Sequence, residues 1–110
     1  MRYDSKELIG KVSDLSSLTE YQEGAIVSRM VVNKEAGTIT AFAFDEGEGL
    51  SEHSAPYDAL AIIIEGKAKI LIKGEEHIIS DNQMIIMPAN VPHAVESITK
   101  FKMLLVMIHA

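Results

Sequence analysis

From residue 24 onward, the chain alternates short runs rich in β-branched and apolar residues with turn signals. The runs occupy 25–32, 38–44, 59–64, 67–73, 76–79, 83–87, 93–97 and 101–108. The turn signals between them are glycine, asparagine, aspartate and proline residues, located at 33–37, Gly47, Gly49, Gly66, Gly74, 81–82 and 88–92. Many short strands separated by turns form a β-sandwich or a β-barrel. We therefore expect an all-β fold.

The alternation within 67–73 shows how one strand should lie. Ala68, Ile70 and Ile72 fall on one face, and three lysines fall on the other, as in a half-exposed strand. Gly74 follows directly and can adopt the positive φ of a tight hairpin turn. We expect a hairpin that leads into the run at 76–79.

In three runs, 59–64, 84–87 and 103–108, both the odd-numbered and the even-numbered positions are apolar, so both faces of each strand are apolar. Strands of this kind need cover on both faces. A barrel interior can cover one face, and either residues 1–20 or a second subunit can cover the other. We expect a homodimer, with cover by residues 1–20 alone as the alternative.

Length and charge restrict the class of protein. A chain of 110 residues is enough for one domain. Its net charge of −6 argues against a nucleic-acid partner, which needs clustered Lys and Arg. The absence of cysteine excludes disulfides, thiolate nucleophiles and Cys-based metal sites. Residues 1–7 mix charges and no apolar run is long enough to span a bilayer, so we expect no cleaved secretion signal, no membrane partner and a cytoplasmic location.

The first part of the chain differs from the rest. Apolar residues recur at roughly helical intervals, at Leu8, Ile9, Val12, Leu15 and Leu18. We expect residues 1–23 to form an N-terminal arm or short helix that packs on the barrel. Residues 24–110 then form the barrel, and the whole chain is a single domain.

Two stretches have the spacing of known motifs. The first, 47–66, begins and ends with glycine and contains His53, and the second, 81–93, contains Pro88 and Pro92 and ends at His93. Together they resemble the two motifs of the cupin superfamily, in particular small single-domain, RmlC-like cupins of the cupin-2 type. The resemblance covers roughly 36–108 and implies a double-stranded β-helix, a jelly-roll barrel. Asn90 replaces a turn glycine, which is a mild change because Asn tolerates the left-handed conformation.

The resemblance also implies a metal held inside the barrel by three imidazoles and one carboxylate. In this chain only His53 and His93 match that set, because Ala55 and Ala59 occupy the positions of the second histidine and the glutamate. Two imidazoles are fewer than catalytic zinc or non-haem iron sites use. A divalent metal such as Zn, Fe, Mn or Ni would therefore bind weakly, if at all. Asp58 lies one residue from the glutamate position, but on a strand this turns its side chain to the opposite face.

A ligand pocket inside the barrel is the second implication. We expect its walls to include His53 and His93, the two small residues between the motifs, and adaptable side chains from other strands. These residues are His53, Ala55, Ala59, His93, Phe42, Met87 and Met103, with Met84 and Met107 as further methionines of the same kind. The alternative is that the methionines and Phe42 are barrel core.

We interpret the chain as a small cupin-fold protein that binds a small organic ligand inside the barrel without a tightly held catalytic metal. The alternative is an enzyme with His53 and His93 as its candidate catalytic residues. It could be a metal-dependent oxygenase or isomerase that uses both histidines, or a metal-free isomerase or epimerase with a histidine base. A purely structural protein is the third alternative.

Overall fold

The computed structural model describes residues 5–109, and within this range the chain forms nine strands and two short 3-10 turns. The elements are η1 Ser5–Leu8, η2 Leu15–Ser17, β1 Ile26–Lys34, β2 Gly37–Phe44, β3 Gly49–His53, β4 Ala59–Glu65, β5 Lys67–Ile72, β6 Glu75–Ser80, β7 Met84–Met87, β8 His93–Ser97 and β9 Phe101–Ile108. Only β3 lacks a counterpart among the predicted runs. Its first residue is Gly49, which the sequence suggested as a turn signal.

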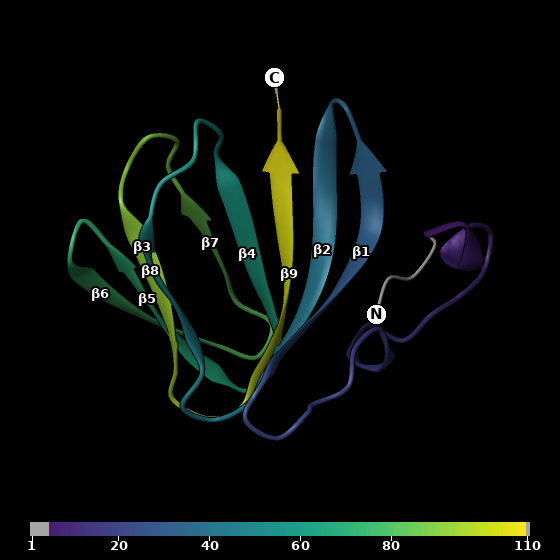
Figure 1. Cartoon of the computed structure of the whole chain (residues 1–110), viewed down its shortest axis with the longest axis horizontal. Coiled ribbons are helices and arrows are strands. Elements are labelled where there is room, and N and C mark those ends of the chain that lie inside the picture. Colours follow the sequence, from purple (N-terminus) through teal and green to yellow (C-terminus); the bar gives the residue numbers. More distant parts are fainter. Residues whose placement is uncertain (1–4, 110) are drawn as a thin grey trace.

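The strands form two antiparallel sheets. One has the order β1-β2-β9-β4-β7 and the other the order β3-β8-β5-β6. Figure 1 shows the two sheets facing each other, close together at one end and further apart at the end that holds the C-terminus. This confirms the prediction of an all-β, jelly-roll barrel.

Strand alternation places one face of each sheet in a shared core. On β4, Ala59, Ala61 and Ile63 are buried, whereas the residues between them are half-buried. Phe44 of β2 and Phe101 of β9 are register partners, and their rings stack with centroids 4.5 Å apart. The remaining buried core residues come from both sheets and are Ala68, Ile70, Ile79, Met87, Val95 and Met103.

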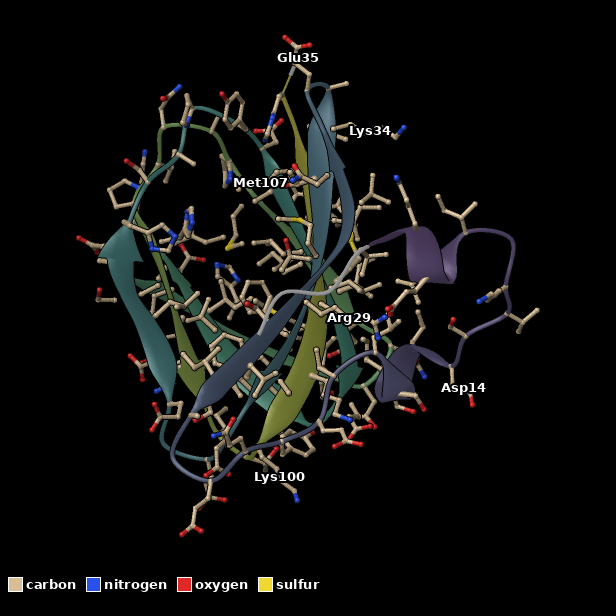
Figure 2. All side chains as sticks on the ribbon, turned by 45° about the vertical axis from the view of Figure 1, so that its right-hand side comes forward. Asp14, Arg29, Lys34, Glu35, Lys100 and Met107 are labelled. Atoms are coloured by element: carbon tan, nitrogen blue, oxygen red, sulfur yellow. The ribbon has the colours of Figure 1, made fainter. Side chains whose placement is uncertain are left out.

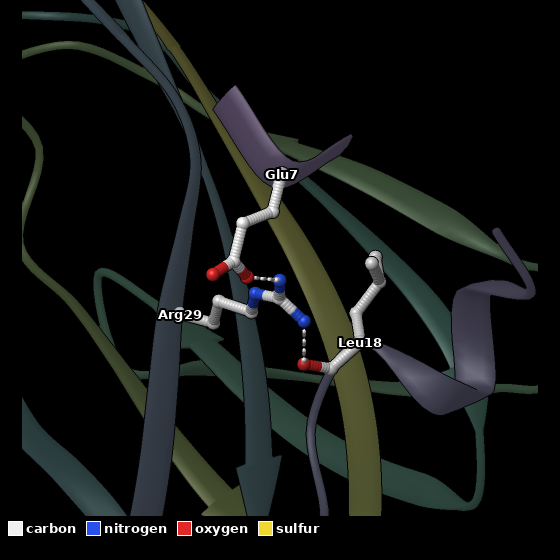
Figure 3. Close-up of polar contacts among 3 residues, drawn as sticks. All are labelled: Glu7, Leu18 and Arg29. Carbon is white, nitrogen blue, oxygen red and sulfur yellow. Dashed lines mark hydrogen bonds and ion pairs between the residues drawn. The ribbon is translucent and has the colours of Figure 1, made fainter. Parts of the chain in front are cut away.

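Residues 5–25 form an irregular arm on the outer side of the five-stranded sheet. Arg29 of β1 holds two points of this arm, because its guanidinium donates to Glu7 Oε2 over 3.3 Å and to the Leu18 carbonyl over 3.4 Å (Figure 3). The buried Lys102 side chain of β9 donates from Nζ to the Ser16 carbonyl. The predicted residues 1–4 of the arm lie outside the described part of the chain.

The arm leaves much of the outer face of this sheet uncovered within residues 5–109. Met84 and Ile86 of β7 are each 53% exposed, and Ile108 of β9 is 56% exposed. Leu60 of β4 and Leu104 of β9, which face the same way, are only partly buried. The face is therefore an apolar surface broader than a scattering of single residues.

Backbone conformation explains several turn residues. Lys73 and Gly74 have φ values of 52° and 78°, as expected for a two-residue hairpin turn between β5 and β6. Asn90 has a φ of 63°, so the expected left-handed conformation is confirmed. Gly66, with a φ of 92°, joins β4 to β5, and a Cβ there would overlap the Lys100 carbonyl oxygen. Gly66 thus combines a positive φ with close backbone contact.

We expect Gly66→Ala to lower the free energy of unfolding by at least about 3 kcal/mol, because both the strain and the clash must be relieved. Gly74→Ala is the matched control, since its φ is also positive but nothing lies within 4 Å of the added Cβ. It should cost only about 1–2 kcal/mol. Urea unfolding monitored by circular dichroism measures both values. Equal losses would show that the contact with residue 100 has no energetic effect.

Candidate functional site

His53 and His93 lie side by side on the interior of the four-stranded sheet. They are register partners at the ends of β3 and β8. Their ring centroids are 4.5 Å apart and the rings meet edge to face at 69°. His53 is exposed, whereas His93 is only 4% exposed. The pair thus runs from the surface into the barrel.

Each ring is oriented by the backbone carbonyl two residues before it. Nδ1 of His53 lies 2.8 Å from the Ser51 carbonyl oxygen, and Nδ1 of His93 lies 3.2 Å from the Val91 carbonyl oxygen. A carbonyl oxygen can only accept, so each Nδ1 must carry the hydrogen. In the neutral rings, each Nε2 is then an acceptor that can interact with an occupant of the barrel.

The environment of His93 keeps its ring neutral. Burial lowers the pKa of His93 below its ordinary value of 6.5, and repulsion from His53 lowers it further. The hydrogen bond to the Val91 carbonyl acts in the opposite direction, but more weakly. At neutral pH, His93 is therefore an uncharged hydrogen-bond acceptor.

The two histidines form one end of a cavity between the sheets. Its volume is about 80 Å³. The other lining residues are small or apolar, and they are Leu50, Ala55, Ala59, Met87, Val95, Met103, Leu105 and Met107. Two imidazoles therefore share the cavity with hydrocarbon and thioether groups.

The loops that carry the two motifs are tied to each other next to the cavity. Asn90 N donates to the Ala55 carbonyl over 2.7 Å, and Ala89 N donates to Asp58 Oδ1 over 2.9 Å. The exposed Asp58 carboxylate therefore holds the β7–β8 loop, and it is not among the residues that line the cavity. It does not replace the missing glutamate.

Most of the residues predicted to line a pocket meet in this cavity. His53, Ala55, Ala59, His93, Met87 and Met103 all contribute to its wall, together with Met107. Phe42 does not, because it packs on Phe44 with ring centroids 5.7 Å apart. Met84 lies on the outer face of β7 and is 53% exposed.

Sequence reasoning missed three lining residues. Leu50 and Val95 are register partners on β3 and β8, and Leu105 lies on β9. Leu50 lies three residues before His53 and is separated from it by a register irregularity, so alternation does not place it on the same face. Val95 lies two residues after His93 on the same strand, so alternation could have identified it. Parity on β9 could have identified Leu105, since it lies midway between Met103 and Met107 on the same face.

The donors present do not fit a metal site with three imidazoles and a carboxylate. Ala55 and Ala59 line the cavity where the two further donors would be needed. Among residues 5–109, no three side chains of His, Cys, Asp or Glu come close enough together to hold a metal ion. A divalent cation would thus have two protein nitrogens and no protein carboxylate.

Comparisons with known proteins agree with this fold. A family model described as "Cupin domain" matches residues 41–109. The chain is 36% identical to a conserved protein of unknown function from Streptococcus pyogenes, with a TM-score of 0.88, covering 92% of this chain and 89% of that one. It is 40% identical to a cupin 2 conserved barrel domain protein from Leptotrichia buccalis, with a TM-score of 0.82, over 84% of this chain and 45% of that chain.

A curated relative matches a smaller part. Mannose-1-phosphate guanylyltransferase from Salmonella montevideo is 42% identical over 52 residues, which are 46% of this chain and 11% of that protein. The chain thus spans about a tenth of the length of this relative. No helix within the described range is long and apolar enough to cross a membrane.

We expect His53→Gln to raise the pKa of His93 toward its ordinary value, because the substitution removes the repulsion between the two rings. Titration of the imidazole carbon-bound protons by NMR measures this pKa directly. His77→Gln is the control, since His77 lies on β6, away from the cavity, with Glu75 as its neighbour. An unchanged His93 pKa in His53→Gln would show that the rings do not interact electrostatically.

Proposed function

The chain belongs to the cupin superfamily, and from this starting point we propose that it binds a small organic ligand in the cavity beside His53 and His93. The proposal includes no tightly held catalytic divalent metal. The fold alone does not specify a ligand or a reaction, because one barrel can host many activities. The support comes from the side chains of the cavity.

One observation carries the proposal: a nearly buried, neutral imidazole faces a small apolar cavity. Polar groups inside a protein are usually hydrogen-bonded, so an imidazole that lines an apolar cavity favours a ligand with a polar group. With Nδ1 engaged by a carbonyl, Nε2 of His93 can accept from a hydroxyl, an amide or a protonated carboxyl group. The apolar walls then suit the hydrocarbon part of the same ligand.

Cavity size limits what can bind. A volume of about 80 Å³ is enough for water molecules or a small chemical group. The ligand therefore has only a few non-hydrogen atoms in the cavity itself. Methionine side chains adapt to irregular shapes, so Met87, Met103 and Met107 can yield some space to a larger guest.

A second candidate function is that of a metal-free isomerase or epimerase, and the protonation state of His93 supports it. A general base must be unprotonated, and burial and repulsion from His53 lower the pKa of His93 in the required direction. In this version, Nε2 of His93 accepts a proton from the bound ligand. The exposed His53 ring, 4.5 Å away between centroids, is a neighbouring group that could return it.

We expect Ala55→Leu to weaken ligand binding by tenfold or more, because the larger side chain fills the cavity. Ala36→Leu is the control, since Ala36 is exposed in the β1–β2 turn. Binding is measured by two-dimensional NMR against a panel of small hydroxy acids, carboxylic acids and sugars, with the His53 and His93 ring signals as reporters. The proposal is wrong if no panel member perturbs these signals, or if Ala55→Leu binds as well as the unaltered protein.

We also propose that the uncovered outer face of the five-stranded sheet forms a homodimer interface. Met84, Ile86 and Ile108 are each more than half exposed on this face, which the described part of the arm leaves open. Monomeric proteins rarely expose broad apolar patches of this kind. A second copy offers the same flat apolar surface, and such self-complementary contacts are typical of two-fold dimers.

We expect sedimentation velocity to give about twice the chain mass of 12.1 kDa. Ile86→Lys should shift the protein to the monomer, because it places a charge in the interface. Ile78→Lys is the matched control, since Ile78 is 52% exposed but lies on β6 of the other sheet. A monomeric unaltered protein, or equal effects of the two substitutions, would contradict the proposed interface.

A further inference from the structure

Methionine side chains line the cavity at the level where a metal-binding relative would present its carboxylate. Ala59 is the register partner of Met87 on β7 and also of Met107 on β9. The three residues therefore form one rung across the five-stranded sheet, with the alanine in the centre. All three line the cavity.

The spacing within this rung would allow the sulfurs of Met87 and Met107 to bind one ion. Neighbouring strands lie about 4.8 Å apart, so the backbones of Met87 and Met107 are roughly 10 Å apart. Each side chain has three rotatable bonds, and only a methyl group projects between them. Figure 2 shows Met107 toward the same end of the barrel as the β1–β2 turn with Lys34 and Glu35, whereas Lys100 lies at the opposite end.

The two histidines offer nitrogens from the opposite sheet. Both Nδ1 atoms are engaged by backbone carbonyls, which leaves both Nε2 atoms for an ion. Two imidazoles that share one metal at about 2.1 Å have ring centroids roughly 5 Å apart. The observed separation of 4.5 Å requires only a small adjustment.

The charge and softness of this donor set select the kind of ion. Two imidazoles and two thioethers are neutral and contain no oxygen, which disfavours Mg²⁺, Ca²⁺ and Mn²⁺. An uncompensated double charge in an apolar cavity is also costly, and the cost grows with the square of the charge. Thioether ligands select Cu(I), which carries a single charge. A volume of about 80 Å³ accommodates one ion with a water molecule.

We propose that the cavity is a binding site for a soft, univalent cation of the Cu(I) type, held by Nε2 of His53 and His93 and by the thioethers of Met87 and Met107. This rests on the same cavity as the proposed function, but it assigns a different occupant. The ion and the organic ligand would compete for the space.

The test uses untagged protein without oxygen and compares Cu(I), competed with bicinchoninate, with Zn(II), competed with a chromogenic chelator. We expect one Cu(I) per chain, bound more tightly than Zn(II). Met87→Leu and Met107→Leu should each weaken Cu(I) binding by tenfold or more and leave Zn(II) binding nearly unchanged. Both substitutions nearly conserve volume, so the fold should survive.

Met84→Leu is the matched control, since Met84 lies on the outer face of the same strand as Met87. His53→Gln is a second variant at an exposed position, and it should also weaken Cu(I) binding. X-ray absorption at the copper edge should show sulfur neighbours that disappear in the double methionine variant. Absence of stoichiometric Cu(I), tighter Zn(II) binding, or equal effects of Met84→Leu and Met87→Leu would overturn the proposal.

The ligand panel on the same samples separates the two proposals. Panel binding without Cu(I) binding overturns the metal site alone. Cu(I) binding without any panel member overturns the proposed organic ligand alone.

Discussion

The arrangement of the cavity depends on the placement of an imidazole in the interior of an apolar barrel. His93 is 4% exposed, and its Nδ1 is engaged by the Val91 carbonyl two residues earlier. That hydrogen bond occupies Nδ1, so Nδ1 carries the hydrogen and Nε2 is the acceptor of the neutral ring. The His93 side chain lines a cavity whose other walls are mainly apolar. The kind of ligand that the barrel can hold therefore depends on Nε2 of His93, which can accept a hydrogen bond, and on the neighbouring exposed His53.

Backbone contacts between loops keep this arrangement in register. The β7–β8 loop is bound to the loop before β4 through Asn90 and Ala89, and to the β5–β6 turn through Lys73 N and the Pro92 carbonyl, 2.9 Å apart. His93 begins the strand that follows this loop. Its position therefore depends on two segments that are distant in sequence, and no single strand determines it.

Local patterns in the sequence predicted most of the barrel. Alternation and turn residues identified eight strands, and the left-handed Asn90 followed from its chemistry. The strand β3 was not predicted because Gly47 and Gly49 are strong turn signals, and Gly49 becomes a strand residue only by pairing with Glu96. The rung of Met87, Ala59 and Met107 depends on pairs whose members are 28 and 48 residues apart in the sequence, which no local pattern encodes. Phe42 was expected in the pocket because it shares a face with Phe44, but that face extends into the core beyond the cavity.

Alanine at positions 55 and 59 changes the electrostatics of the interior as well as its ligand set. A histidine and a glutamate at these positions would bring a charge into the barrel and would require a cation to balance it. With two methyl groups instead, the described lining of the cavity carries no acidic group, although the whole chain has a net charge of −6. Three of the residues that line the cavity are methionines, and the cavity measures about 80 Å³. A small, neutral and polarisable interior favours occupants of low charge, whether they are uncharged molecules or a soft univalent ion.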